Sequence, residues 1–203
     1  DSDHLTAEKQ KVIGALILQR EKLNSVSAQQ RTEAVIAWIR LHGIQALPWT
    51  DELRQWQARV ICLHTLQASE STTNSDARFP DVSESQLLAT LEQWLAPYLN
   101  DVRHRRHING IDLKSALHAQ LLWPLPAKLD ELAPTHYAVP TGSQIRIDYT
   151  QNPPVLAVKL QEMFGEKQTP SIANGKIPLQ IHLLSPARHP LAVTQDLPSF
   201  WNN

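Results

Sequence analysis

A short basic run, Arg103-His104-Arg105-Arg106-His107, is the only cluster of like charge in the chain. Three arginines against Asp101 alone leave a local charge of about +2. Guanidinium groups contact phosphates, and the gain in affinity falls as salt rises. The run is therefore a candidate nucleic-acid-binding site. Two other interpretations stay open: a solvated loop, and a docking surface for acidic groups elsewhere in a longer protein. The candidate residues are Arg103, Arg105 and Arg106.

Base stacking would need aromatic side chains close to these charges. The nearest ring along the sequence is Tyr98, so aromatic interleaving is absent from the run itself. Two further basic residues, Arg146 and Lys159, are expected on the polar faces of two strands. They could line a second groove, although charges on a strand are usually the solvated side of a sheet.

Two acidic pairs, Asp51-Glu52 and Asp130-Glu131, superficially resemble the acidic box that holds magnesium in a helicase motor. Such a box follows a buried strand and works with a phosphate-binding loop. The first pair instead opens an expected helix, and the second lies near the end of one. Gly175-Lys176 lacks the following Ser or Thr, and Pro170 replaces the glycine that a phosphate loop needs upstream. We therefore expect no nucleotide hydrolysis by this chain alone and no catalytic residue in it.

Metal-binding and nucleophilic motifs are equally sparse. His104 and His107 have a spacing that can bind a metal, but no acidic or cysteine ligand accompanies them, and solvated histidines are the simpler interpretation. The single cysteine, Cys62, lies in an apolar run and is expected to be a buried core residue. One cysteine permits no intrachain disulfide, which suits a reducing, cytoplasmic setting. We expect no metal or cofactor in this chain.

Composition narrows the class of protein further. The chain has 203 residues, of which 42% are hydrophobic and 19% charged, as in ordinary globular proteins. Its net charge is -1, so any nucleic-acid surface must be a local patch. No apolar run approaches the roughly 18 residues that cross a bilayer, and we expect no membrane partner. The chain begins at Asp1 and its only methionine is Met163. We expect it to be a piece of a longer protein.

The elements that would position these residues are helical in the first two thirds. Residues 1–25 predict a strand or hairpin with a bend at Gly14. Residues 27–68 predict a pair of amphipathic helices, the first capped by Ser27 and ended by Gly43. Residues 69–81 are polar and predict an exposed, flexible linker, and residues 82–133 a second helical region. An apolar stripe in the second helix favours core packing over a cofactor groove. It comprises Leu53, Trp56, Val60 and Leu63.

Residues 134–203 predict a β-rich module. Ile145, Ile147 and Tyr149 alternate with polar residues, the period of a half-buried strand, and a second strand follows from Val155. Asn174-Gly175 predicts a type I′ hairpin turn, and Pro178 an edge strand. A last strand covers 191–194 and a helix begins at about 197. The expected fold class is α+β: a helical segment followed by a mainly antiparallel β-rich module.

Five segments stand out in residue wording: LPWTDELRQWQARV in the first 75 residues, then THYAVPTGSQIRIDY, PPVLAVKLQEMFG, IPLQIHLLSPARHPLAVTQDL and FW, in that order. The last four resemble the C-terminal region of bacterial HrpB-type DEAH-box ATP-dependent RNA helicases, and LPWTDELRQWQARV is the best-matching part of the first 75 residues. The resemblance runs through most of residues 80–201. These segments are specific to this tail and do not mark an active site.

The resemblance implies an accessory role. The parent helicase would couple ATP and magnesium to movement on RNA through motor domains outside this chain. The chain would pack on that motor and could guide a single strand of RNA. Residues 1–25 would be the edge of a preceding oligonucleotide-binding-type (OB-like) barrel. The alternative is a protein–protein interaction module that nucleic acid never touches.

Overall fold

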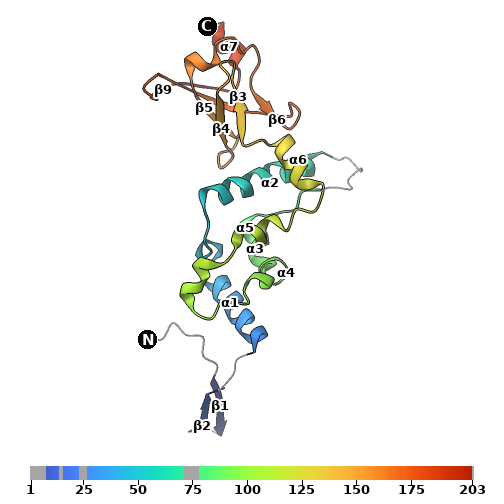
Figure 1. Cartoon of the computed structure of the whole chain (residues 1–203), viewed down its shortest axis with the longest axis vertical. Helices are drawn as coiled ribbons and strands as arrows, with labels where there is room; N and C mark the ends of the chain where they lie inside the picture. The colour runs from blue at the N-terminus through green and yellow to red at the C-terminus, as the bar shows by residue number, and fades with distance from the viewer. Residues whose placement is uncertain (1–7, 14–15, 23–26, 71–77, 203) are drawn as a thin grey trace. The chain divides into compact units, whose positions relative to one another are not determined.

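A computed structural model describes residues 8–13, 16–22, 27–70 and 78–202. The chain divides into two compact units, each built from two separate stretches of sequence. Unit 1 comprises residues 1–50 and 83–120, and unit 2 comprises residues 51–82 and 121–203. The two expected helices within 27–68 therefore fall in different units. Figure 1 shows the elements of both along the chain.

The N-terminal residues form a hairpin of two antiparallel strands, β1 (Glu8–Ile13) and β2 (Leu16–Lys22). The register shifts by one residue between Lys11 and Val12, which is a β-bulge. Of the two expected forms, a strand or a hairpin, the described residues have the hairpin. The expected bend at Gly14 lies outside the described residues, and the OB-like barrel stays a prediction.

Helix α1 (Ala28–His42) begins and ends where the sequence predicts. The Ser27 hydroxyl accepts the amide of Gln30, whose side chain accepts the Ser27 amide, a complete capping box. Gly43, with φ of 86°, ends the helix and returns its N–H to the Ile39 carbonyl. Both ends of the helix are thus marked by local hydrogen bonds.

The rest of unit 1 consists of short helices packed on an apolar core. They are η1 (Ile44–Ala46), α3 (Glu84–Ala89), α4 (Leu91–Trp94), η2 (Ala96–Tyr98), η3 (Arg105–Gly110) and α5 (Leu113–His118). The helical run that begins after Ser83 is interrupted at Thr90, which leaves helical geometry with φ of -115°. The Trp94 indole nitrogen spans the break and donates to the Leu87 carbonyl.

In unit 2, helix α2 (Asp51–Ser69) buries the expected stripe of Leu53, Trp56, Val60 and Leu63 as core. The exposed linker expected over 69–81 differs from the structure at both ends. Ser69 is the last residue of α2, and Phe79 is 2% exposed. The Phe79 amide donates to Gln67, and its carbonyl bonds with His64. Residues 71–77 lie outside the described residues.

A buried arginine joins α2 to helix α6 (Leu125–Leu132). Arg59 is 5% exposed, and its Nε donates to the Ala133 carbonyl at 2.6 Å. Its Nη2 donates to an Asp130 carboxylate oxygen at 2.7 Å and to the Leu129 carbonyl at 3.4 Å. The last carbonyls of a helix lack intrahelical partners and attract a cation. Arg59 therefore closes the carboxyl end of α6.

The β-rich module is a five-stranded sheet in the order β3-β4-β5-β8-β9. Its strands are β3 (His136–Ala138), β4 (Gln144–Asp148), β5 (Val155–Lys159), β8 (Gln180–Leu184) and β9 (Pro190–Thr194). A hairpin of β6 (Ser171–Ile172) with β7 (Ile177–Pro178), a 3-10 turn η4 (Leu160–Met163) and helix α7 (Leu197–Trp201) complete the module. The α+β class is confirmed, and α7 lies beside the sheet in Figure 1.

The place of Pro178 corrects the expectation of an edge strand, and the direction of one ladder adds a detail to the expected sheet. Pro178 belongs to the small β6–β7 hairpin, whereas the strand that follows it, β8, lies in the interior of the sheet. β8 pairs with β5 in parallel, so the mainly antiparallel sheet contains one parallel ladder. A proline in the two-residue β7 leaves the β8 amides free to pair on both sides.

The expected turn at Asn174-Gly175 is present: the two residues have φ of 56° and 84°, and the Lys176 amide donates to the Ala173 carbonyl at 3.2 Å. Ala173 and Asn174 have φ of 52° and 56°, and the Gly175 amide donates to the Ile172 carbonyl. Positive φ at both central residues is the mark of a type I′ turn, and two such turns overlap here, one centred on Ala173-Asn174 and one on Asn174-Gly175. The buried Ala173, whose amide also donates to the Leu132 carbonyl, holds this register.

We expect Tyr149 to make the protein less stable in alkali. Burial raises the pKa of Tyr149 above its ordinary value, and its hydroxyl donates to the Pro134 carbonyl at 2.6 Å. Above about pH 10 the unfolded chain ionises this tyrosine and the folded chain does not, so stability falls as pH rises. Denaturant unfolding should show a Tyr149→Phe variant losing about 1.4 kcal/mol less per pH unit than the parent protein above that pH. If the free energy of unfolding fell equally steeply with pH in the parent protein and in the variant, this expectation would be wrong.

Candidate nucleic-acid interface

The basic run lies in unit 1, at the start of η3 and just before it. Residues 102–108 are held by two buried side chains, Val102 and Ile108, which leave the arginines between them facing solvent. His107 fixes the loop from within, because its Nδ1 lies 3.2 Å from both the Arg103 amide and the Asp101 carbonyl. Within the described residues, none of the three arginines makes an ion pair. The structure therefore brings Arg103, Arg105 and Arg106 together as exposed cations.

An aromatic ring lies against this cluster, contrary to the expectation from sequence. The Arg105 guanidinium carbon is 5.6 Å from the centroid of the Trp38 ring in α1. The His42 ring stacks on Trp38 with centroids 4.2 Å apart and planes 22° from parallel. Cations within about 6 Å of an aromatic face are attracted by its quadrupole. Trp38 is half-buried, whereas Arg105 and His42 are exposed. We name Trp38, His42 and Arg105 the stacked cluster.

Sequence reasoning missed Trp38 because it lies 67 residues before Arg105. The helical period places Trp38 and His42 on one face of α1. Trp38 is half-buried and His42 is exposed, so the end of that face is open to solvent. The signal that could have been used is the spacing of four residues between two flat side chains, which stacks them on a helix surface.

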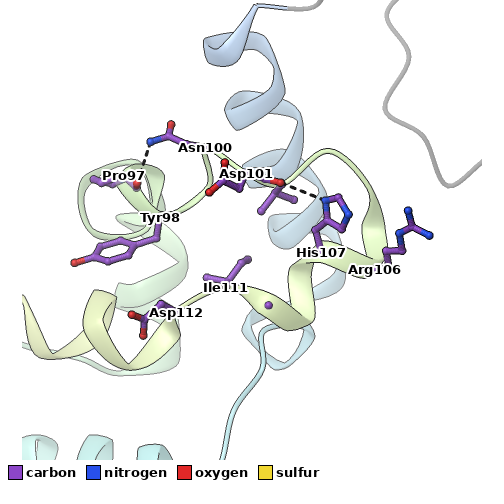
Figure 2. Close-up of a pocket in the computed structure, with 10 residues that line it drawn as sticks. Pro97, Tyr98, Asn100, Asp101, Arg106, His107, Ile111 and Asp112 are labelled. Atoms are coloured by element: carbon purple, nitrogen blue, oxygen red, sulfur yellow. Dashed lines mark hydrogen bonds between the residues drawn. The ribbon is translucent and has the colours of Figure 1, made fainter.

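A hollow of about 550 Å³ lies beside the basic run and is shown in Figure 2. In that view Tyr98 and Arg106 lie toward opposite ends, with Ile111 between them. Its lining residues are Pro97, Tyr98, Asn100, Asp101, Val102, Arg106, His107, Gly110, Ile111 and Asp112. The hollow thus combines one aromatic side chain and one arginine with two carboxylates.

The carboxylates limit what this hollow can bind. Asp112 caps α5 by accepting the Ser115 amide at 3.0 Å, and hydrogen bonding with Ser115 lowers the pKa of its carboxyl group. Asp112 therefore keeps its negative charge near neutral pH. A phosphate inside the hollow would meet this charge and that of Asp101, so phosphates are better placed on the outer arginines.

The two other candidate residues belong to unit 2. Arg146 projects from β4 and forms an ion pair with Asp51, whose side chain is 70% exposed. Lys159 ends β5, is half-buried, and has no ion-pair partner among the residues that the structure describes. Because Asp51 already offsets the charge of Arg146, this residue is a weaker phosphate contact than the arginines of unit 1.

The acidic pairs and the histidines take structural roles. Asp51 is bound by Arg146 and Asp130 by Arg59. The rings of His104 and His107 meet edge to face, 5.0 Å apart. The described residues contain no group of three or more His, Cys, Asp or Glu side chains that could hold a metal ion. Cys62 is half-buried rather than fully buried, and burial raises the pKa of its thiol.

The family model described as "ATP-dependent helicase C-terminal" (HrpB_C) matches residues 94–203, more than half of the chain. The chain therefore belongs to this family. None of the helices that the structure describes is long and apolar enough to span a membrane.

The relatives are helicases from one organism. The ATP-dependent RNA helicase HrpB of Escherichia coli K12 is 40% identical over 198 residues, which cover 97% of this chain and 24% of that protein. The crystal structure of the E. coli DExH-box NTPase HrpB superposes with a TM-score of 0.79 at 35% identity, covering 98% of this chain and 26% of that one. A crystal structure of the E. coli DEAH/RHA helicase HrpB has a TM-score of 0.75 at 37% identity, covering 97% and 24%. The chain spans about a quarter of the length of these relatives.

Proposed function

We propose that this chain is the accessory C-terminal region of an ATP-dependent RNA helicase and that it contacts single-stranded RNA through its basic run. In this proposal ATP and magnesium act in motor domains outside the chain, and the chain packs on that motor. The chain itself contributes cations and a fixed surface and carries out no bond-breaking step.

The observation that carries the RNA contact is the exposure of three neighbouring arginines without an ion pair among the described residues. Elsewhere in the chain, Arg40, Arg59 and Arg146 are bound by carboxylates at 2.5–2.7 Å. Exposed arginines in an ordered loop can each bind two phosphate oxygens when no carboxylate already binds them. This contact would position a strand without reading its sequence.

Charge reversal tests the proposal. We expect Arg105→Glu and Arg106→Glu each to weaken binding of a short fluorescent single-stranded RNA about tenfold, equally for different sequences. The slope of log affinity against log salt should become shallower by about 0.7 for each lost phosphate contact. Fluorescence anisotropy over a salt series, with the whole chain, measures both quantities.

The matched control is Arg188→Glu, which makes the same charge change on an exposed turn of unit 2. It should leave both the affinity and the salt slope close to those of the parent protein. Loss of binding in the control as severe as in the other two variants would mean that only net charge matters. Undiminished binding in both reversals of the basic run would remove that run from the strand path.

The alternative is a surface for a protein partner. Leu122 and Trp123, in the turn that precedes α6, are 74% and 83% exposed, which is unusual for adjacent large apolar side chains. The near-neutral net charge also suits a protein partner. The same titration separates the two candidates, because a chain that binds no RNA at low salt would favour the partner surface.

A further inference from the structure

We infer that the stacked cluster of Trp38, His42 and Arg105 binds an unpaired nucleobase, which makes the RNA contact selective for single strands. The inference rests on the proposed function and adds to it a base-binding element. It concerns two side chains of α1, Trp38 and His42, that stand outside the basic run.

The three side chains of the stacked cluster each present a flat group. The His42 and Trp38 rings lie nearly parallel at 4.2 Å, and the Arg105 guanidinium lies over Trp38 at 5.6 Å. Imidazole, indole and guanidinium are all planar surfaces on which bases stack. His42 and Arg105 are exposed, so each can extend the stack with one more planar group.

The side chains of the stacked cluster are held in place by the surrounding structure. The His42 ring bonds through Nδ1 to the Trp38 carbonyl at 2.9 Å, which holds the imidazole above the turn that carries Trp38. Arg105 begins η3, and the buried Ile108 fixes that turn to the core of unit 1. Flat groups that are already held in place cost little conformational entropy when a base is added.

The positive charge of the basic run lies beside the stacked cluster. Arg106 follows Arg105 in the chain, Arg103 lies two residues before it, and all three are exposed. A base bound on the stacked cluster would therefore have its own phosphates next to exposed guanidinium groups. Aromatic groups beside a basic track are the arrangement that binds single strands without sequence preference. A duplex keeps its bases stacked inside and could use only the phosphate contacts.

The test compares one RNA in two forms, using the whole chain. The probe is a short RNA carrying 2-aminopurine, either single-stranded or annealed to its complement. We expect the parent protein to bind the single strand about tenfold more tightly than the duplex and to quench 2-aminopurine only in the single strand. His42→Ala and Arg105→Lys should each lower the preference about threefold or more and weaken the quenching.

Each variant of the cluster removes one flat group. Arg105→Lys keeps the positive charge but loses the planar guanidinium and its paired hydrogen bonds to phosphate, so it should weaken single-strand binding more than duplex binding. His189→Ala, an exposed histidine of unit 2 outside the cluster, is the matched control and should retain both preference and quenching. Circular dichroism and melting temperatures of all variants check that α1 is still folded.

The outcomes separate the two proposals. Binding of neither RNA by the parent protein would overturn the proposed function and the inference together. Equal binding of both RNAs would leave the phosphate contact standing and overturn the stacking site. A single-strand preference that persists unchanged in both His42→Ala and Arg105→Lys would also overturn the stacking site.

Discussion

An Arg59→Ala variant should unfold at markedly lower denaturant concentration than the parent protein. The side chain is 5% exposed and donates to the Ala133 and Leu129 carbonyls. Without it, these carbonyls lose a charged donor in a place that water reaches poorly, and the packing of the arginine stem is lost as well. We expect a loss of about 3 kcal/mol in the free energy of unfolding, measured by urea denaturation.

The partner carboxylate provides the control. The Asp130 side chain is 78% exposed, so its ion pair with Arg59 is largely screened by water. Asp130→Asn keeps an oxygen acceptor at the same place and should cost less than about 1 kcal/mol. If Asp130→Asn cost as much as Arg59→Ala, the ion pair rather than the carbonyl contacts would hold α6 to α2.

A Leu156→Ala variant should be destabilised by a comparable amount for a different reason. Leu156 is 0% exposed in β5, which is paired on one side with β4 and on the other with β8. Strands on both sides restrict the collapse of the cavity that the substitution leaves. We expect a loss of about 2–5 kcal/mol, seen as a lower urea midpoint with an unchanged slope.

Leu191→Ala is the matched control, because it removes the same atoms from an edge strand. Leu191 in β9 is 56% exposed and leaves no closed cavity when truncated. Its loss should stay within about 0.5 kcal/mol. Similar losses at the two leucines would mean that the sheet interior relaxes around a missing side chain as freely as its edge does.

Local signals explain why much of the secondary structure could be predicted from the sequence. Ser27 and Gly43 bound α1 through their own hydrogen bonds and dihedral angles, and the burial of Ile147 and Tyr149 follows from strict alternation. Pairing between strands depends on contacts across the fold. No residue pattern in β5 or β8 indicates that the two strands pair, or that they pair in parallel.

In the candidate site too, features set by adjacent residues could be predicted from the sequence, and features set by contacts between distant residues could not. The three arginines of the basic run could be found because they are adjacent in sequence. Trp38 could not be placed beside Arg105, because the chain between them includes α2, which belongs to the other unit. Nor could sequence show that Asp51 offsets the charge of Arg146, since the two residues are 95 positions apart.

The interleaving of the two units has a consequence for how the protein is made. The chain passes from one unit to the other after residues 50, 82 and 120, so α1 leaves the ribosome well before the segment of residues 83–120 that completes its unit. Between these moments the buried face of α1, with Val35, Ile36 and Ile39, has none of its partners from that segment. Synthesis therefore passes through a stage in which α1 has emerged without the segment that completes its unit, with its apolar face exposed in the way that makes folding intermediates prone to aggregate.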